Sequence, residues 1–422
     1  MRRKRIRNYK ERFIVSGIKT KSFYRSMIHK VFSPMKLGRM TMVLPDGQER
    51  IYGHGSEIKC VVYVHNEDFF KKCVLYGDVG FGESYVDGDW DTPDITKVVQ
   101  WMILNVEAHP TMMADRARRS KVNYLKTFNT IVHKLRDNTL EGSRKNISAH
   151  YDLSNDFFKT FLDSSMAYSS AYFKSASQTL HEAQLAKFEL WCQKLRLKPT
   201  DHVLEIGSGW GGFAIYAAKN YGCHVTGITI SKEQYEYSRQ LIKEQHLEGK
   251  IDIRLEDYRH MKGQFDKIIS IEMIEAVGHK FLTSYFRQIH KLLKNDGVVG
   301  LQMIISPDHR YESFRKNADW IQKHIFPGSL LPSTEAVYKA VRQTGTLGMF
   351  DWEDVSPSYA RTLAIWRENF NRHSTKIKEL GFDQAFIRKW NYYFSYCEGA
   401  FSMRNIGVVH AVLTRPNNYL LV

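Results

Sequence analysis

The stretch Val203-Leu204-Glu205-Ile206-Gly207-Ser208-Gly209-Trp210-Gly211-Gly212 decides the fold of this chain. It begins as an apolar strand, continues as a glycine-rich turn with a carboxylate at its entrance, and leads into a helical sequence. Glycine lets the backbone take positive φ angles and approach a bulky ligand closely. The stretch therefore predicts a strand–turn–helix unit that holds a nucleotide-like cofactor with Glu205 beside it. A tight turn without a ligand is the alternative.

The residues around the turn narrow the choice of cofactor. Folds that bind NAD use G-x-G-x-x-G and place an acid at the end of the second strand, where it holds the ribose. Here the turn reads G-S-G-W-G-G, and the strand 223–229 ends without an acid, which argues against NAD. No Gly-Lys-Ser/Thr follows, so a P-loop is excluded. Glu256 and Asp257 follow the strand 251–255 and are placed to accept a hydrogen bond from an adenine amino group. S-adenosylmethionine (SAM) stays a candidate.

Strands and helices alternate from about residue 179 onward. The predicted strands span 202–206, 223–229, 251–255, 265–271, 297–305 and 408–414. Thr179 with Glu182 forms a capping-box pattern for one helix, Ser231 with Gln234 opens another, and a third is expected near 280–293. This alternation predicts a parallel, doubly wound sheet, in which ligands sit outside the carboxyl ends of the strands.

The first third of the chain has a different pattern. Met40 to Leu44 is followed by the hairpin signal Pro45-Asp46-Gly47, and Ile58 to Val64 alternates with period two. Gly77 to Trp90 is rich in Gly and Asp and is expected to form loops. Two amphipathic helices are expected at 95–107 and about 112–136, and the polar stretch 137–148 is the candidate domain boundary. The predicted division is an arm at 1–35, an N-terminal domain at 36–140 and a catalytic domain at 141–422.

Positive charge is concentrated at the N-terminus. The sequence of 422 residues has a net charge of +16, of which residues 1–39 supply +12 through 13 Lys and Arg against Glu11 alone. Such an arm can lie on anionic lipid, where each cation contributes about 1 kcal/mol. It can also hold nucleic acid by phosphate neutralisation, or remain a solvated tail. Charge alone does not separate these three alternatives.

Cysteine usage and hydropathy indicate the compartment. The five cysteines lie far apart without a C-x-x-C pair, so they fit neither a zinc site nor a disulfide framework, and no metal site is expected. A reducing cytosol is the simplest setting. The sequence has no secretory signal pattern and no run of about 20 apolar residues, so we expect a soluble or peripheral protein.

Several segments resemble the cyclopropane fatty acid synthase family of SAM-dependent methyltransferases. They are HYDLSNDFF (150–158), MAYSSAYF (166–173), VLEIGSGWGGFAIYAA (203–218), VTGITISKEQ (225–234), RLEDYR (254–259), SIEMIEAVG (270–278), HIFPGSLLPS (324–333) and YARTLAIW (359–366). Together they cover about residues 146–415, in the order of the family. The N-terminal region is similar to the smaller lipid-binding domain of longer members. The resemblance implies an α/β, doubly wound, Rossmann-like SAM-dependent methyltransferase domain preceded by a smaller α+β lipid-binding domain.

The resemblance also implies a reaction. A methylene group from SAM is added to the cis double bond of an unsaturated acyl chain of a membrane phospholipid, through a carbocation that loses a proton to bound bicarbonate. A cation is vulnerable to water, so the pocket must be dry and aromatic-lined. The candidate wall residues are Phe157, Phe158, Phe161, Tyr172, Phe173, Tyr359, Phe394 and Phe401. The expected setting is cytoplasmic, at the inner face of the membrane, with residues 1–39 on the anionic surface and a homodimer as the assembly.

Family positions for bicarbonate fall on a small set of residues. They are Ser170, Glu275, Gln302, Ile304 and Tyr359, with Ser170 and Ile304 contributing backbone groups. Glu275 would orient the ion in its protonated form, and Tyr359 would donate its hydroxyl. Well-studied members have Cys in place of Ser170 and His in place of Gln302. A backbone contact tolerates the first change, but Gln cannot titrate near neutral pH as His does. Diverted proton loss would give a methylene or, with a reductant, a methyl-branched product.

Family positions for SAM form a second set, which surrounds the glycine-rich turn. Tyr168 and Ser169 match positions near the methionine moiety, across from Gly207, Gly209 and Gly211. The remaining matches are Thr229, Ser231 and Gln234 in place of the usual ribose-binding acid, and Glu256 and Asp257 near adenine.

Three other functions are weighed against the cyclopropane synthase. The nearest is a methyltransferase that methylates carbon in the middle of unsaturated acyl lipids. A non-catalytic lipid-binding protein is disfavoured by the intact Glu205, Glu275 and Tyr359. A nucleic-acid methyltransferase would explain the basic arm, but the sequence lacks a base pocket of the Asn/Asp-Pro-Pro-Tyr type, so no nucleic-acid partner is expected.

Overall fold

The computed structural model describes residues 23–108 and 153–421, and the protein divides into two units. The first unit comprises Met1–Asn129 with Asp383–Met403, and the second comprises Thr130–Phe382 with Arg404–Val422. The helix expected at 112–136 and the boundary expected at 137–148 lie outside the described residues. The sequence did not indicate that a segment near its end joins the first unit.

The described part of the second unit is built on a seven-stranded sheet with the order β10-β11-β9-β8-β5-β6-β7. The strands are β5 (His202–Ile206), β6 (His224–Thr229), β7 (Ile251–Leu255), β8 (Phe265–Ile271), β9 (Leu293–Ile305), β10 (Gly348–Asp354) and β11 (Gly407–Thr414). From β7 across to β9 neighbouring strands are parallel, which confirms the doubly wound arrangement. The strand order reverses between β5 and β8.

The far edge of this sheet corrects the expectation of parallel strands throughout. β11 runs antiparallel to β9 and to β10, so the sheet is mixed. β11 is buried along nearly its whole length, and a buried apolar run looks the same in parallel and antiparallel strands. β10 was not predicted, because its sequence GMFDWED interleaves acids with apolar residues at a partly exposed edge.

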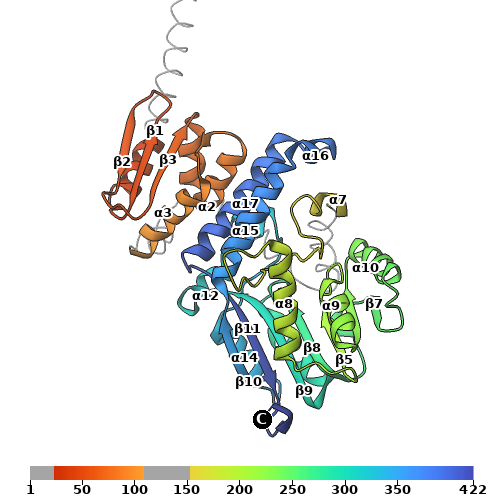
Figure 1. Ribbon diagram of the computed structural model, residues 1–422. Helices are drawn as coiled ribbons and strands as arrows, with labels where there is room; N and C mark the ends of the chain where they lie inside the picture. The colour runs from red at the N-terminus through yellow and green to blue at the C-terminus, as the bar shows by residue number, and fades with distance from the viewer. Residues whose placement is uncertain (1–22, 109–152, 422) are drawn as a thin grey trace, which may run out of the picture. The chain divides into compact units, whose positions relative to one another are not determined.

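Helices cover both faces of the sheet (Figure 1). They are α7 (Asn155–Phe158), α8 (Leu180–Lys194), α9 (Gly212–Tyr221), α10 (Lys232–Glu244), α11 (Leu282–Leu292), α12 (Asp308–Phe314), α13 (Trp320–His324), α14 (Thr334–Arg342), α15 (Ser356–Arg372) and α16 (Ser374–Glu379). Short 3-10 turns are η1 (Tyr258–His260), η2 (Ile274–Ala276), η3 (His279–Phe281) and η4 (Tyr419–Leu421). Val203 packs with the core under α8 and α9, whereas Leu204 packs with the core under α11 and α14. Successive residues of β5 thus face opposite layers, as the pleat requires.

Two predicted helix starts are confirmed. Thr179 and Glu182 form the reciprocal capping box of α8. Ser231 caps α10 by accepting a hydrogen bond from the backbone N–H of Gln234. These caps fix where the helices begin, and therefore which residues stand at the carboxyl ends of the strands before them.

The first unit contains a four-stranded sheet with the order β2-β1-β3-β4. The strands are β1 (Arg39–Val43), β2 (Glu49–Tyr52), β3 (Lys59–Val64) and β4 (Trp90–Asp91), and the helices are α2 (Asp68–Val86), α3 (Ile95–Ala108) and α17 (Gln384–Ser402). β1 and β2 form the predicted hairpin. The loops expected between Gly77 and Trp90 are wrong: α2 occupies most of that segment and only kinks at Gly77, where φ is 61°.

α17 belongs to the first unit although it comes from near the end of the sequence. The Oγ1 atom of Thr96 in α3 donates to Glu398 at 3.0 Å, and Arg388 pairs with Asp91 at 2.8 Å. Gly399 lies directly against Val99, at a position where a Cβ atom would be 2.8 Å from the valine side chain. The fold of the first unit therefore depends on a helix about 280 residues further along the sequence.

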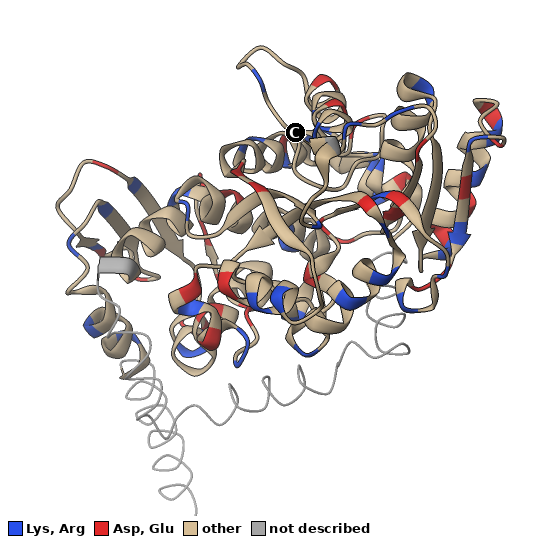
Figure 2. Cartoon of the chain, turned by 90° about the horizontal axis from the view of Figure 1, so that it is seen from below, with Lys and Arg blue, Asp and Glu red and all other residues tan. Residues whose placement is uncertain are grey.

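Positive charge is less concentrated along the described part of the chain than in the N-terminal sequence. Basic and acidic residues are interspersed over the described ribbon (Figure 2), and the cation-rich run at 1–39 is described only from residue 23 onward. Within residues 23–108 and 153–421, no helix combines the length and the apolar character that crossing a bilayer requires.

Candidate functional site

The glycine-rich turn follows β5 at the carboxyl edge of the parallel strands. Gly207, Gly209 and Gly211 all have positive φ angles, of 83°, 52° and 87°. A Cβ atom at Gly207 would be 2.9 Å from the Met273 side chain, so any other residue there would have to displace this neighbour. At Gly209 no described atom beyond its two chain neighbours lies within 4 Å of that position, so the space beside the backbone is open there. The turn lies where the strand order reverses, which is where doubly wound folds bind ligands.

Glu205 lies beneath this turn. Its side chain is buried, and its carboxylate accepts a hydrogen bond from the backbone N–H of Ala214 in the first turn of α9. Burial raises the pKa of this carboxyl well above its usual value, against the opposing effect of Lys187. The second carboxylate oxygen has no hydrogen-bond partner among the described residues. Glu205 thus ties the strand to the helix behind the turn, and its contact with a cofactor stays a prediction.

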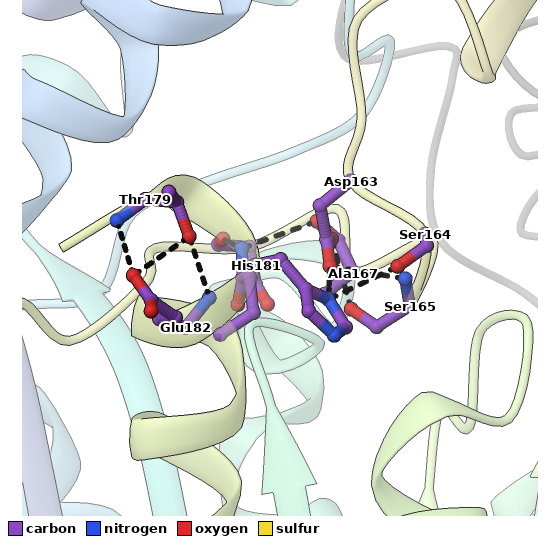
Figure 3. A network of polar contacts seen from close by, with 9 residues as sticks. Asp163, Ser164, Ser165, Ala167, Thr179, His181 and Glu182 are labelled. Atoms are coloured by element: carbon purple, nitrogen blue, oxygen red, sulfur yellow. Dashed lines mark hydrogen bonds and ion pairs between the residues drawn. The ribbon is translucent and has the colours of Figure 1, made fainter.

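The segment that leads to Tyr168 is fastened to the start of α8 (Figure 3). Asp163 pairs with His181 at 2.7 Å and also accepts hydrogen bonds from the backbone N–H and the hydroxyl of Ser165. One turn further along α8, the amide of Gln184 donates to the carbonyl oxygen of Ser169 at 3.0 Å. These contacts hold the segment along the helix, next to the turn after β5.

Lys187 is the second buried polar residue of α8 and was missed by the sequence analysis. Its ammonium donates to the hydroxyl of Ser169 at 2.7 Å, and its side chain is fully buried. Burial lowers the pKa of Lys187 to about 8, although the charges of Glu272, Asp163 and Glu205 act in the opposite direction. A lysine beside an apolar helix face is normally solvent-exposed, so the only sequence signal was its position next to the buried Phe188.

A hydrogen-bonded cluster forms around Glu272, at the carboxyl end of β8. Its Oε1 atom accepts from the backbone N–H of Ser170 at 2.8 Å and from the amide of Gln302 at 2.7 Å. Tyr359 also donates a hydrogen bond to this side chain. Burial raises the pKa of Glu272, and the hydrogen bonds and the charge of Lys187 oppose that shift. Glu272 was missed, although it stands in the quoted segment SIEMIEAVG three residues before Glu275.

Glu275 lies in η2 on the other side of this cluster. Its Oε1 atom accepts a hydrogen bond from the backbone N–H of Ile304, and its Oε2 atom has no partner among the described residues. Burial and the negative charge of Glu272 raise the pKa of Glu275 to about 8. A carboxyl with such a pKa is mostly protonated at neutral pH, and it can then donate a hydrogen bond.

The five residues expected to hold bicarbonate therefore come together. The backbone N–H groups of Ser170 and Ile304, however, donate to the carboxylates of Glu272 and Glu275. The hydroxyl of Ser170 donates to the carbonyl oxygen of Ala171. Ser170 therefore joins the cluster through its backbone, as expected for a backbone contact. An ion in this place would share these N–H groups with two carboxylates.

The residues expected near ribose form a local network at the end of β6. Thr229 donates its hydroxyl to the side-chain oxygen of Gln234 at 2.8 Å and accepts from the backbone N–H of Ser231 at 3.1 Å. All three residues are buried. These hydrogen bonds join the three residues at the start of α10, and their contact with a ribose stays a prediction.

The residues expected near adenine stand at the end of β7. Glu256 donates its backbone N–H to the carbonyl oxygen of Thr229 at 2.9 Å. Asp257 is buried, which by itself would raise its pKa, but two hydrogen bonds from the Arg259 guanidinium at 2.8 Å hold that pKa below the usual value. Both residues lie beside β6, and their contact with adenine stays a prediction.

Aromatic side chains surround Tyr168. Its ring centroid is 5.5 Å from Phe158, 6.0 Å from Phe161 and 5.3 Å from Trp366. Trp366 was missed by the sequence analysis and is fully buried. Phe173 instead stacks under the guanidinium of Arg361. The other expected wall residues divide between the units: Phe157, Tyr172 and Tyr359 belong to the second, and Phe394 and Phe401, on α17, belong to the first.

Metal ligands are not assembled at this site. Residues 23–108 and 153–421 hold no group of three or more His, Cys, Asp and Glu side chains that could bind a metal ion. Among the described cysteines, Cys60, Cys73, Cys192 and Cys223 form no disulfide bond.

Comparisons with known proteins agree with this geometry. The family model of mycolic acid cyclopropane synthetase matches residues 138–411. A tuberculostearic acid methyltransferase of Mycobacterium tuberculosis is 36% identical over 363 residues, which cover 84% of this chain and 83% of that protein. The cyclopropane-fatty-acyl-phospholipid synthase of Escherichia coli is 36% identical over 362 residues, which cover 84% of this chain and 87% of that protein.

A solved structure shares the fold of the second unit. The crystal structure of mycolic acid cyclopropane synthase CmaA1 complexed with SAH and CTAB matches with a TM-score of 0.61 and 31% identity, over 64% of this chain and 98% of that protein. With the family match over more than half of the sequence, this likeness leads to one conclusion: the chain belongs to the mycolic acid cyclopropane synthetase family of SAM-dependent methyltransferases.

Proposed function

We propose that this enzyme transfers a methylene group from SAM to the cis double bond of an unsaturated acyl chain in a membrane phospholipid and closes a cyclopropane ring. One observation carries the proposal. The open glycine-rich turn after β5, the buried carboxyl cluster after β8 and the aromatic side chains around Tyr168 lie together in the second unit. The name of the Escherichia coli relative, a cyclopropane-fatty-acyl-phospholipid synthase, supports the substrate class.

The residues of the site fit a role in holding SAM, which supplies an electrophilic methyl group when bound. The turn from Gly207 to Gly211 would take the cofactor against its backbone, because the space beside Gly209 is open and glycine adds no side chain to fill it. The segment with Tyr168 and Ser169 is held in place by Gln184 and Lys187 of α8. A positively charged sulfonium ligand would favour the ionised form of the buried carboxyl groups in this region, since opposite charges attract strongly where water is excluded.

The aromatic side chains suit the second half of the reaction. An alkene that accepts a methyl group becomes a carbocation, and aromatic ring faces stabilise a cation while excluding water. Phe158, Phe161 and Trp366 surround Tyr168 with such rings. A dry site of this kind lets the cation survive until the added methyl group loses a proton.

We propose bicarbonate as the acceptor of that proton. The buried Oε2 atom of Glu275 has no hydrogen-bond partner among the described residues, and a protonated carboxyl there would donate to an anion. Gln302 and Tyr359 add neutral donors. Gln302 and Tyr359 now donate these hydrogen bonds to Glu272, so bicarbonate would compete with Glu272 for them.

A second product is favoured by a specific observation. A relative with 36% identity is named a tuberculostearic acid methyltransferase. In this protein Gln302 cannot take up a proton near neutral pH. If a hydride shifts to the cationic carbon before the added methyl group loses its proton, the product is a methylene rather than a ring, and a separate hydride donor would convert that methylene to a methyl branch.

The test uses the full-length protein, SAM and liposomes that contain a cis-monounsaturated phospholipid. Mass spectrometry of the released fatty esters should show a product heavier by one CH2, and NMR of that product separates a ring from a branch. Removing bicarbonate from the buffer should slow formation of a ring. Measurable SAM binding without any product would contradict the proposed reaction and leave lipid binding as the function.

We also propose that the protein acts as a homodimer at the inner, cytoplasmic face of the membrane, with residues 1–39 on anionic lipid. The net charge of +12 in this segment supports the contact. Deleting residues 1–30 should weaken binding to anionic liposomes and flatten its dependence on salt. Unchanged binding would mean that residues 1–39 are a solvated tail and do not contact the membrane. Sedimentation of the purified protein tests whether it is a dimer.

A further inference from the structure

His410 on β11 stands directly opposite Gln302 on β9 in the antiparallel register. Both side chains are 1% exposed. The Oε1 atom of Gln302 accepts hydrogen bonds from His410 at 2.9 Å and from the indole of Trp191 at 3.3 Å. Its Nε2 atom donates to the carbonyl oxygen of Ser170 at 3.1 Å and to Glu272 at 2.7 Å. The carboxamide is therefore fully used, with its oxygen toward His410 and its nitrogen toward the site.

The indole fixes which nitrogen of His410 carries hydrogen. An indole N–H can only donate, so the atom of Gln302 that faces Trp191 must be the oxygen. The same oxygen faces the Nε2 atom of His410, and two acceptors would repel each other there. His410 must therefore be the tautomer with hydrogen on Nε2. Its Nδ1 atom is then an acceptor, and it has no partner among the described residues.

The surroundings keep this imidazole neutral. Burial, together with the positive charges of Lys194 and Lys187, lowers the pKa of His410 to about 3. Trp191 packs against the ring with the centroids 4.5 Å apart. Trp191 reaches this position because Gly300 has no side chain: a Cβ atom there would be 2.6 Å from the indole. The imidazole is thus locked by packing as well as by its hydrogen bond.

The orientation of the carboxamide matters for the site. If it turned over, the oxygen of Gln302 would face the carboxylate of Glu272 and the carbonyl of Ser170, and its NH2 group would face the N–H of Trp191. Each of these contacts would be repulsive, and Glu272 would lose the hydrogen bond that opposes the rise of its pKa. The donor at His410 therefore acts together with Trp191 to fix the orientation in which Gln302 meets the carboxyl cluster.

We propose that His410 is a positioning residue for methylene transfer: from the neighbouring strand it holds the Gln302 carboxamide in the one orientation that serves Glu272 and the Ser170 segment. This inference rests on the proposed function for its kinetic consequence but not for its geometry. His410 acts through Gln302 and touches neither the cofactor nor the acyl substrate in this role. No residue of β11 was predicted from the sequence to belong to the site.

Two substitutions separate positioning from mere filling of space. His410→Leu removes the donor at similar volume and should lower kcat about tenfold, with the KM for SAM within about twofold of the wild type. His410→Gln restores an amide N–H where the Nε2–H stood, and should recover activity to within about threefold of the wild type. His202→Gln is the matched control, because His202 lies on β5 and bonds Thr226 outside the cluster. Wild-type kinetics in His410→Leu would overturn the proposal, as would equal loss in His410→Gln and His410→Leu.

A second measurement needs no turnover. In protein labelled with 15N-histidine, the resonance that disappears in His410→Gln should report a neutral ring with hydrogen on Nε2 from pH 5 to pH 8. A hydrogen on Nδ1, or protonation of the ring above pH 5, would overturn the assignment. Because this spectrum is independent of activity, it tests the placement of His410 even if the liposome assay yields no product.

Discussion

Glu275→Gln gives the sharpest test of the electrostatics of the carboxyl cluster. The pKa of this carboxyl rises from 4.5 to about 8 through burial and the charge of Glu272. A carboxyl whose pKa is higher in the folded state than in the unfolded state does not affect stability at low pH, where it is protonated in both states. Stability is lost as the pH rises from the pKa of the unfolded state toward the pKa of the folded state. Between pH 5 and pH 8 this linkage amounts to about 3 kcal/mol of unfolding free energy. Gln resembles the protonated carboxyl and does not titrate, so the variant should escape that loss.

The assay is urea unfolding of the wild type and the variant at pH 5 and pH 8, fitted for the transition that contains the second unit. The variant should gain about 3 kcal/mol relative to the wild type on going from pH 5 to pH 8, whatever its difference at pH 5. Glu248→Gln, at an exposed carboxyl between α10 and β7, is the control and should show no such gain. An equal difference between Glu275→Gln and the wild type at both pH values would refute the reasoning.

Three further predictions address the rest of the site. Gly209→Val places a β-branched side chain at a φ of 52° and in the space left for a ligand, so the KM for SAM should rise at least tenfold in the liposome assay, and an unchanged KM would be contradictory. Tyr359→Phe removes the hydroxyl that bonds Glu272 and should lower kcat about tenfold at a constant KM for SAM, whereas a pure KM effect would argue against this role. Lys187→Met removes the donor to Ser169, so calorimetry should show SAM affinity about tenfold weaker, and equal affinity would mean that the bond to Ser169 does not position the segment.

The sequence was sufficient to predict elements whose structure depends on residues that are close together in the chain. The strand before Gly207, the capping box of Thr179 and the cap at Ser231 are local patterns, and the structure confirms each of them. The kink at Gly77 shows the limit of such reasoning. Glycines there signalled a loop, but the backbone is helical on both sides of the kink.

The sequence did not predict the buried polar residues whose burial depends on contacts with residues far away in the chain. Lys187, Glu272 and His410 are polar residues, which are mostly exposed in proteins, and the apolar residues next to them in the sequence do not indicate which polar partners they contact. Their partners lie far away in the sequence: Ser170 and Glu272 are separated by 102 residues, and His410 and Gln302 by 108. A polar cluster of this kind becomes visible only when the order of the strands is known.

The placement of α17 has a consequence for how the protein is made. A polypeptide emerging from the ribosome folds its domains as their residues become available, at roughly 5–20 residues per second. The sheet from β1 to β4 leaves the ribosome early, but the helix that packs against α3 is not synthesised until residues 384–402. The first unit must therefore wait, incomplete and with apolar surface uncovered, while the whole sheet up to β10 is translated. Fragments that stop before residue 384 should fail to complete it, however well their catalytic half folds.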